Sequence, residues 1–171
     1  IDFQDEGTFP VSIQKAIERY FPGKKGDEAY KNHLITLVKR ALSVPIQCGG
    51  QEHFTLSEIA KNKRLNEFEF NYVVPNEFSL LRLEYILGQE DARSIITMRS
   101  SVKGMMNGLI DCFFEHKGKY YILDWKSNFL GDSFHDYNEE KLRQTMNENN
   151  YHLQYLLYTY AAHQYLQQKL E

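Results

Sequence analysis

The sequence has few cysteines and no long apolar run. Its only two cysteines, Cys48 and Cys112, are far apart and lack the spacing of metal ligands, so neither a disulfide framework nor a zinc site is indicated. No apolar run is long enough to span a membrane, and no signal peptide precedes the first expected helix. We therefore expect no membrane association and a reducing, cytoplasmic setting.

An excess of positive charge is also missing. The formal net charge is −3 at pH 7, whereas a free-standing DNA-binding protein usually carries a basic surface. This balance counts against a strong autonomous grip on DNA. It does not exclude chemistry on phosphodiesters, because acidic metal ligands lower the net charge and a partner or neighbouring domain could supply the basic surface.

Apolar and aromatic residues, in contrast, are abundant. The 171-residue chain is 42% hydrophobic and 14% aromatic, which is sufficient for a buried core. Because the chain opens at Ile1 without a Met, we expect a fragment of a longer protein. We expect it to form a single domain over residues 1–171, with a helical part at 1–63 and a core at 64–171.

Hydrophobic periodicity predicts both helices and strands. Residues 65–74 alternate between apolar and polar side chains and stop at Pro75, which predicts a half-buried strand. Residues 108–128 follow the pattern of a strand, a glycine-containing turn and a second strand. Apolar residues at helical spacing predict helices at 10–20, 29–42, 77–87, 138–150 and 151–170. This order predicts an α/β domain rather than a helical bundle.

The segment GLIDCFFEHKGKYYILDWKSN contains an opposed pair of acidic residues if it folds as a tight hairpin. With Lys117-Gly118 as a two-residue turn, Asp111 falls directly opposite Asp124. Lys126, two residues after Asp124, then points to the same face. Lys-Gly is a weaker turn signal than Asn-Gly, so a longer loop is an alternative. Both faces of the hairpin are largely apolar, and we expect it to be central in a sheet and covered on both sides.

Two opposed carboxylates in an apolar setting require a physical explanation. Directly opposed side chains have Cβ atoms about 4.5–5.5 Å apart, and at that distance two carboxylates repel unless one is protonated or a cation lies between them. Mg²⁺ prefers oxygen ligands and is often held by one or two carboxylates, water and substrate phosphate. A nearby lysine can polarise water or stabilise negative charge at phosphorus. The alternative interpretation is that Asp-x-Lys at a strand end is a solvated rim or an ion pair.

Two strand motifs and one helix motif together resemble a known family. "GLIDCFF" with Asp111 and "YYILDWKSNFLG" with Asp124 and Lys126 resemble the PD-(D/E)XK nucleases. The closer likeness is to the nuclease domain at the C-terminal end of the RecB-type β subunit of exodeoxyribonuclease V. "YHLQYLLYTYAAHQYL", with Gln154 and Tyr158, resembles the Q-x-x-x-Y helix of that family. The likeness spans roughly residues 64–168, and the combination is specific, whereas Asp-x-Lys alone is not.

This resemblance implies a fold, a cofactor and a set of metal ligands. The fold would be restriction-endonuclease-like, with a central mixed β-sheet flanked by helices. Asp111 and Asp124 would bind Mg²⁺, for which Mn²⁺ could substitute, and the backbone carbonyl of Trp125 would be a possible third ligand. Lys126 would be the catalytic lysine.

Other residues are candidates for contacts with the substrate. The resemblance implies that Gln154 and Tyr158, which share one helix face, line the site. Tyr158 could equally belong to the core stripe of its helix. Ser127 and Asn128 follow the lysine and could donate hydrogen bonds to phosphate. Lys103 could do the same, although a solvated surface position is its default interpretation.

One position departs from the family pattern. RecB-type domains usually carry a metal-binding His in a G-T-x-x-H segment, but here "GTFPV" places Val11 at that position. Valine cannot bind a metal, so the ion would have fewer protein ligands, another residue would substitute, or the site would be weakened. His33 and Glu69 are the nearest candidates by sequence, and each is more simply explained as a surface or structural residue.

The sequence leaves three functional hypotheses. The first is a metal-dependent DNA nuclease of the exodeoxyribonuclease V type, with DNA as its substrate. Its helicase motor would lie elsewhere in the parent chain, since this sequence has no G-x-x-x-x-G-K-[ST] motif, and it would act with the other subunits of a RecBCD-like complex in double-strand-break repair. The second is a degenerate nuclease fold that binds DNA or acts as a scaffold. The third is a metal-dependent hydrolase of another phosphate ester.

Overall fold

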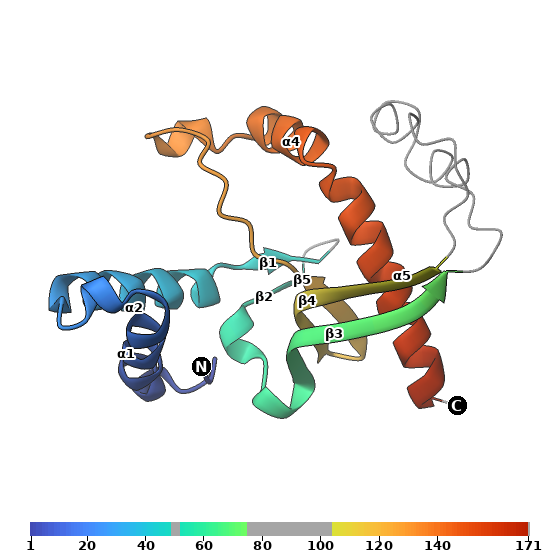
Figure 1. The fold of residues 1–171 in the computed structure, drawn as a ribbon, viewed down its shortest axis with the longest axis horizontal. Helices are drawn as coiled ribbons and strands as arrows, with labels where there is room; N and C mark the ends of the chain where they lie inside the picture. The colour runs from blue at the N-terminus through green and yellow to red at the C-terminus, as the bar shows by residue number, and fades with distance from the viewer. Residues whose placement is uncertain (49–51, 75–103, 171) are drawn as a thin grey trace. The chain divides into compact units, whose positions relative to one another are not determined.

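The computed structural model describes residues 1–48, 52–74 and 104–170. The helix expected at 77–87 and the candidate residue Lys103 lie outside these ranges. The helices and strands, joined by short 3-10 turns, are α1 (Phe9–Tyr20), α2 (Glu28–Ser43), β1 (Ile46–Gln47), β2 (His53–Phe54), β3 (Arg64–Val74), β4 (Gly104–His116), β5 (Lys119–Leu123), α4 (Glu139–Glu148) and α5 (Tyr151–Leu170) (Figure 1).

The expected α/β class is confirmed. The described residues form four helices and two antiparallel sheets, an arrangement compatible with a restriction-endonuclease-like fold. One sheet pairs β1 with β2, and the other has the order β3-β4-β5, so β4 is its central strand. None of the helices within the described ranges is long and apolar enough to cross a membrane.

The chain divides into two compact units. The first contains Ile1–Leu65 and Phe114–Tyr121, and the second contains Asn66–Phe113 and Ile122–Glu171. The division after Leu65 is close to the boundary between the helical part and the core that the sequence predicts. The tip of the β4–β5 hairpin belongs to the first unit, although the sequence assigns it to the core.

Helix α1 lies in the first unit, and its sequence explains both where it starts and which face it buries. Pro10 lies in the first turn, where its missing N–H is not needed. Phe9, Ile13 and Ile17 recur four residues apart and are buried. Burial of each such side chain contributes about 1.5–3 kcal/mol. Of the apolar stripe expected at Val11, Ile13, Ala16, Ile17 and Tyr20, only Ile13 and Ile17 are buried, and Val11 and Tyr20 are exposed. The stripe was wrong in part, because the buried face runs through Phe9, Ile13 and Ile17.

Helix α2 has a side-chain cap at its start. The carboxylate of Asp27 accepts a hydrogen bond from the backbone N–H of Tyr30 at 2.9 Å. This contact satisfies one of the first amide groups of the helix, which have no partner within it. The same hydrogen bond lowers the pKa of Asp27 below its ordinary value, so the charged form of the cap is favoured.

The tip of the β4–β5 hairpin is the two-residue turn that the sequence predicts. Lys117 and Gly118 have φ angles of 50° and 76°, and two positive φ values are typical of the tight hairpin turn that matches strand twist. The Glu115 carboxylate accepts the Gly118 N–H at 2.9 Å and forms an ion pair with Lys63. The turn is therefore fixed by a side chain from its own strand.

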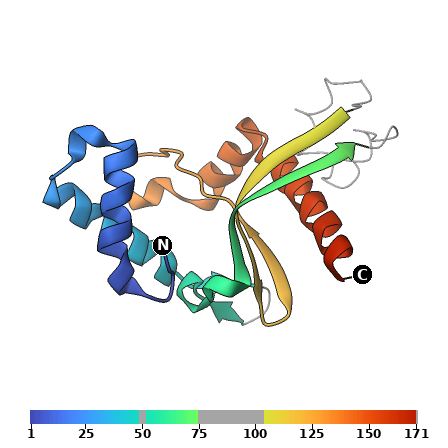
Figure 2. The same cartoon turned by 60° about the horizontal axis from the view of Figure 1, so that its bottom comes forward.

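The core of the second unit lies where α5 packs against β3 and β4 (Figure 2). Its buried residues include Ala161 and Ala162, whose small side chains allow close approach of the helix. Aromatic rings from the strands surround them: Phe68 stacks on Phe113 at 5.5 Å, and Phe70 meets Tyr158 edge-on at 5.8 Å. Helix α5 is thus held to the sheet mainly by aromatic contacts.

Strand β4 is covered on both faces, as expected for a central strand. Cys112, Phe113 and Phe114 are buried in succession. Ile110, Phe113 and Ile122 pack in one core cluster with residues of β3 and α5.

Candidate active site

The end of the β4–β5 hairpin brings Asp111 to the segment that contains Asp124. Asp111 lies half-buried on β4, and Asp124 directly follows Leu123, the last residue of β5. The carboxylate of Asp111 accepts a hydrogen bond from the backbone N–H of Trp125 at 2.7 Å. Since Trp125 is the next residue after Asp124, the two acids belong to one small region of the molecule. The pairing register inferred from the turn agrees with this contact.

Lys126 completes a cluster of three charged groups. Its ammonium forms an ion pair with the Asp124 carboxylate. The side chains of Asp124 and Lys126 are 19% and 35% exposed, so both are reachable from solvent yet partly shielded from it. Partial shielding strengthens electrostatic interactions relative to open water. The cluster could therefore hold a cation between its acids and present a positive charge to an anion.

Tyr151 positions the lysine from the start of α5. The Lys126 ammonium lies 4.4 Å from the centre of the Tyr151 ring, a distance typical of a cation–π contact. The Tyr151 hydroxyl donates a hydrogen bond to the side-chain oxygen of Asn128 at 3.0 Å. The helix thus fixes the loop that follows β5 at two points.

Gln154 and Tyr158 are joined directly. The Gln154 amide donates a hydrogen bond to the Tyr158 hydroxyl at 2.8 Å. Tyr158 also packs against the core cluster, as expected for the core stripe of its helix. Its contact with a substrate stays a prediction. Tyr151, Gln154 and Tyr158 are spaced three and four residues apart and therefore share one face of α5.

A cavity of about 530 Å³ lies beside this helix face. Lys126, Gln154 and Tyr158 all line it, so the structure brings these three predicted residues to one space. Tyr151 lines it as well. Pockets of 300–1,000 Å³ that combine apolar walls with a few polar groups are typical of small-ligand sites. Neither aspartate lines the cavity, and Lys126 is the residue that connects the cavity to the acidic pair.

The loop after the lysine is held by an internal network. The Lys141 ammonium donates to the Asp136 carboxylate at 2.6 Å and to the Leu130 carbonyl at 3.2 Å. Asp136 also accepts the Ser133 N–H at 3.0 Å. The hydrogen bond from Lys141, followed by that from Ser133, lowers the pKa of Asp136. Ser127, the first residue of the loop, is exposed beside Lys126 and available to a ligand.

The residues considered for a third metal ligand lie on three different elements. Val11 is 60% exposed on α1, and His33 lies on α2; both belong to the first unit. Glu69 is exposed on β3 in the second unit. Within residues 1–48, 52–74 and 104–170, no three His, Cys, Asp or Glu side chains form a group that could hold a metal ion.

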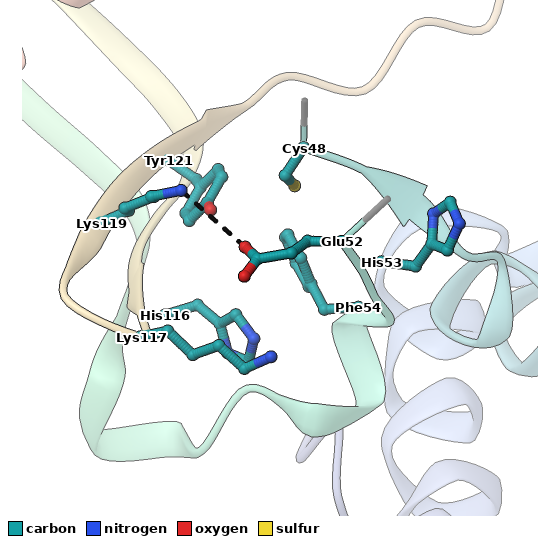
Figure 3. A pocket seen from close by; sticks show the side chains of 8 residues that line it. All are labelled: Cys48, Glu52, His53, Phe54, His116, Lys117, Lys119 and Tyr121. Atoms are coloured by element: carbon teal, nitrogen blue, oxygen red, sulfur yellow. Dashed lines mark ion pairs between the residues drawn. The ribbon is translucent and has the colours of Figure 1, made fainter. Parts of the chain in front are cut away.

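A second, smaller cavity of about 110 Å³ lies in the first unit (Figure 3). Cys48, His116 and Tyr121 line it, together with the ion pair between Lys119 and Glu52 at 3.9 Å. Burial and then a hydrogen bond with Cys48 raise the pKa of Tyr121. None of the predicted site residues lines this cavity.

Comparison with curated proteins identifies relatives that share this region. The chain is 36% identical over 141 residues to the RecBCD enzyme subunit RecB of Buchnera aphidicola subsp. Acyrthosiphon pisum. The matched region covers 81% of the chain and 12% of that relative. It is 32% identical over 142 residues to the RecBCD enzyme subunit RecB of Haemophilus influenzae, and the matched region covers 82% of the chain and 12% of that relative. It is 34% identical over 119 residues to the RecBCD enzyme subunit RecB of Escherichia coli, and the matched region covers 68% of the chain and 10% of that relative.

The chain belongs to the RecB family. It spans about a tenth of the length of the RecB relatives it matches. No family model matches the chain. The resemblance to RecB-type proteins seen in the hairpin and helix motifs is therefore confirmed at the level of the family.

Two residues of the site in this RecB-family chain were missed by the sequence analysis. Tyr151 contacts Lys126, and Asn107 on β4 lines the larger cavity. The helical spacing of Tyr151 with Gln154 and Tyr158 was a usable signal. Asn107 gave none, because an exposed polar residue on a strand is the ordinary pattern.

Proposed function

We propose that this chain is a RecB-type nuclease domain that hydrolyses DNA phosphodiester bonds with the help of Mg²⁺. The observation that carries the proposal is the hydrogen bond from the Trp125 N–H to Asp111. This hydrogen bond connects Asp111 to the segment that contains Asp124 and Lys126. Two carboxylates and an ammonium at one end of a hairpin suit the hydrolysis of a negatively charged ester.

The residues present fit a hard divalent ion. Asp111 and Asp124 supply carboxylate oxygens, and the Trp125 carbonyl between Asp124 and Lys126 is a further oxygen donor. Mg²⁺ commonly binds through only one or two carboxylates, with water and substrate phosphate completing its shell, so the absence of a third acid among the described residues is compatible with it. When bound, the ion would lower the pKa of an attacking water and stabilise the leaving oxygen.

Lys126 would act on the phosphate itself. In hydrolysis, a water oxygen attacks phosphorus, the bond to the bridging oxygen breaks, and the departing oxygen takes up a proton. Negative charge grows on the phosphoryl oxygens as the new bond forms. The ammonium of Lys126, held between Asp124 and the Tyr151 ring, would stabilise that charge from a fixed position. Ser127 and Asn128 would bind neighbouring phosphates.

The wider setting follows from the relatives' printed names. They are RecB subunits of RecBCD enzymes. By analogy, we place this chain in a RecBCD-like assembly, with a helicase domain in the parent protein and DNA-break repair as its role. The net charge of −3 agrees with a domain whose grip on DNA depends on such neighbours.

The sharpest test replaces the lysine and follows cleavage of labelled DNA. Lys126→Ala should lower the rate by at least about 100-fold, the typical cost of losing one group that stabilises charge in the transition state. Lys15→Ala is the matched control, because Lys15 is exposed on α1 in the first unit. An unchanged rate in Lys126→Ala, with the fold intact by circular dichroism, would contradict the assigned role.

A second candidate function is a degenerate nuclease fold that binds DNA without cutting it. Val11 at the expected histidine position favours it. Titration of Mg²⁺ or Mn²⁺ separates the two: saturable binding that Asp111→Ala removes supports the nuclease, and no binding supports the scaffold. Cleavage of a small phosphodiester but of neither single-stranded nor duplex DNA would instead indicate another phosphoesterase.

A further inference from the structure

The cavity beside Lys126 has room for a flat heterocycle and a lining that suits one. Its volume is about 530 Å³. Phe70, Tyr151 and Tyr158 contribute aromatic rings, and Asn107 and Gln154 contribute amides. Aromatic rings stack on nucleobases, and amide side chains pair with base edges through a donor and an acceptor. This combination suits a nucleobase better than a phosphate or a lipid chain.

The charge of the lining points the same way. Among the described residues that line the cavity, Lys126 is the only charged one and none is acidic. A neutral interior with one cation at its border does not repel a polyanion. It favours an arrangement in which the uncharged base enters the cavity and the phosphate of the same nucleotide remains near the ammonium.

Lys126 links the cavity to the acidic pair. Its ammonium pairs with Asp124 and lies over the Tyr151 ring, which is itself part of the cavity wall. A phosphate held at Lys126 is therefore the one next to any base seated in the cavity. The hydrogen bond from Gln154 fixes the Tyr158 hydroxyl at 2.8 Å, so two polar groups of the wall are already oriented.

We propose that this cavity binds one unstacked nucleobase adjacent to the phosphodiester bond that is cut, and so sets the position of the strand. The proposal rests on the proposed nuclease function and adds a specificity-determining subsite to it. Removing a base from its stack costs a few kcal/mol in a duplex and less in a single strand. Contacts with the aromatic and amide walls would offset that cost.

The test scans a single abasic residue along a labelled single-stranded oligonucleotide and measures the cleavage rate with Mg²⁺ in the full chain. We expect one position, fixed relative to the cut, at which the missing base lowers the rate about tenfold, in line with the loss of one stacked base. Equal rates at all positions would overturn the proposal.

Three variants assign the effect to the cavity. Leu153→Trp places a bulky ring in it, because Leu153 lines it from α5, and Asn107→Ala removes an amide from its wall. In Leu153→Trp the penalty at the sensitive position should shrink to less than about twofold. In Asn107→Ala, which keeps the aromatic walls, it should shrink by a smaller factor. Leu142→Trp is the matched control, since Leu142 is 47% exposed on α4 and outside the lining. A penalty that persists undiminished in Leu153→Trp and Asn107→Ala, both folded by urea denaturation, would overturn the proposal.

A second readout separates this proposal from the nuclease assignment. Oligonucleotides that carry 2-aminopurine at successive positions are bound to Asp111→Asn protein, and the base fluorescence is recorded. A position-dependent change that Leu153→Trp abolishes supports the base seat even if no DNA is ever cleaved. Fluorescence that is the same at every position, or unaffected by Leu153→Trp, overturns the base seat while leaving the cleavage result to decide the nuclease.

Discussion

Lys126 is held by two contacts of different kind. Its ammonium pairs with Asp124, and the Tyr151 ring lies 4.4 Å from it. A mobile lysine loses rotational freedom when it binds a phosphate, and this loss weakens binding. Lys126 has already lost much of that freedom on folding, so binding costs it less. At the scale of single residues, the position of Lys126 therefore depends on Tyr151 as well as on Asp124.

Substitutions at Tyr151 separate the ring from the hydroxyl. Tyr151→Phe keeps the ring under the ammonium and removes only the hydrogen bond to Asn128, so kcat should change little. Tyr151→Leu removes the cation–π contact, worth about 1 kcal/mol, and kcat for DNA cleavage should fall about fivefold. Steady-state kinetics of both variants measure this difference. Equal losses in the two variants would mean that the hydroxyl, rather than the ring, positions the lysine.

Strand β4 carries Asp111 and also passes close to the ring of Phe70. A Cβ atom at Gly108 would lie 2.3 Å from Cζ of Phe70, far inside van der Waals contact. Phe70 is buried and packs against Tyr158, so its ring has little room to move. Glycine in the middle of this strand is therefore a packing requirement of the sheet.

Gly108→Ala should consequently destabilise the fold. Overpacking of this kind costs about 1–3 kcal/mol, seen as a lower urea midpoint. Gly23→Ala is the control, because no atom lies within 4 Å of the added Cβ there, and its midpoint should stay near that of the wild type. Adding Phe70→Leu to Gly108→Ala should recover part of the loss in a double-mutant cycle. Additive effects would show that the two positions do not interact.

The elements differ in how far the sequence predicts them. The helices and the hairpin were predictable because period, caps and a two-residue turn are local features. The closeness of Asp111 to the Asp124 segment followed from the turn alone. The cavity was not predictable, since it depends on where α5 packs against β4. Tyr151 could have been found only from its helical spacing with Gln154 and Tyr158.

Across the whole molecule, hydrogen-bonded carboxylates link stability to pH. Asp27, Glu58 and Glu115 in the first unit and Asp136 in the second each have a lowered pKa, caused mainly by hydrogen bonds from backbone N–H groups or lysines. A pKa that is lower in the folded than in the unfolded chain means that folding is favoured when the group is charged. Such stabilisation is complete above the ordinary values of 3.8 for Asp and 4.5 for Glu and is lost as the pH falls through the folded values.

The urea midpoint should therefore be level near neutral pH and fall steadily below about pH 4.5. Glu115 tests the cause, because its pKa is lowered by Lys63 and then by the Gly118 N–H. Glu115→Gln cannot ionise, so its midpoint should be lower than that of the wild type at pH 7 and should fall less steeply in acid. Glu140→Gln, at an exposed position on α4, should leave the slope unchanged. If Glu115→Gln falls as steeply as the wild type, its hydrogen-bonded carboxylate does not contribute to the acid sensitivity of the fold.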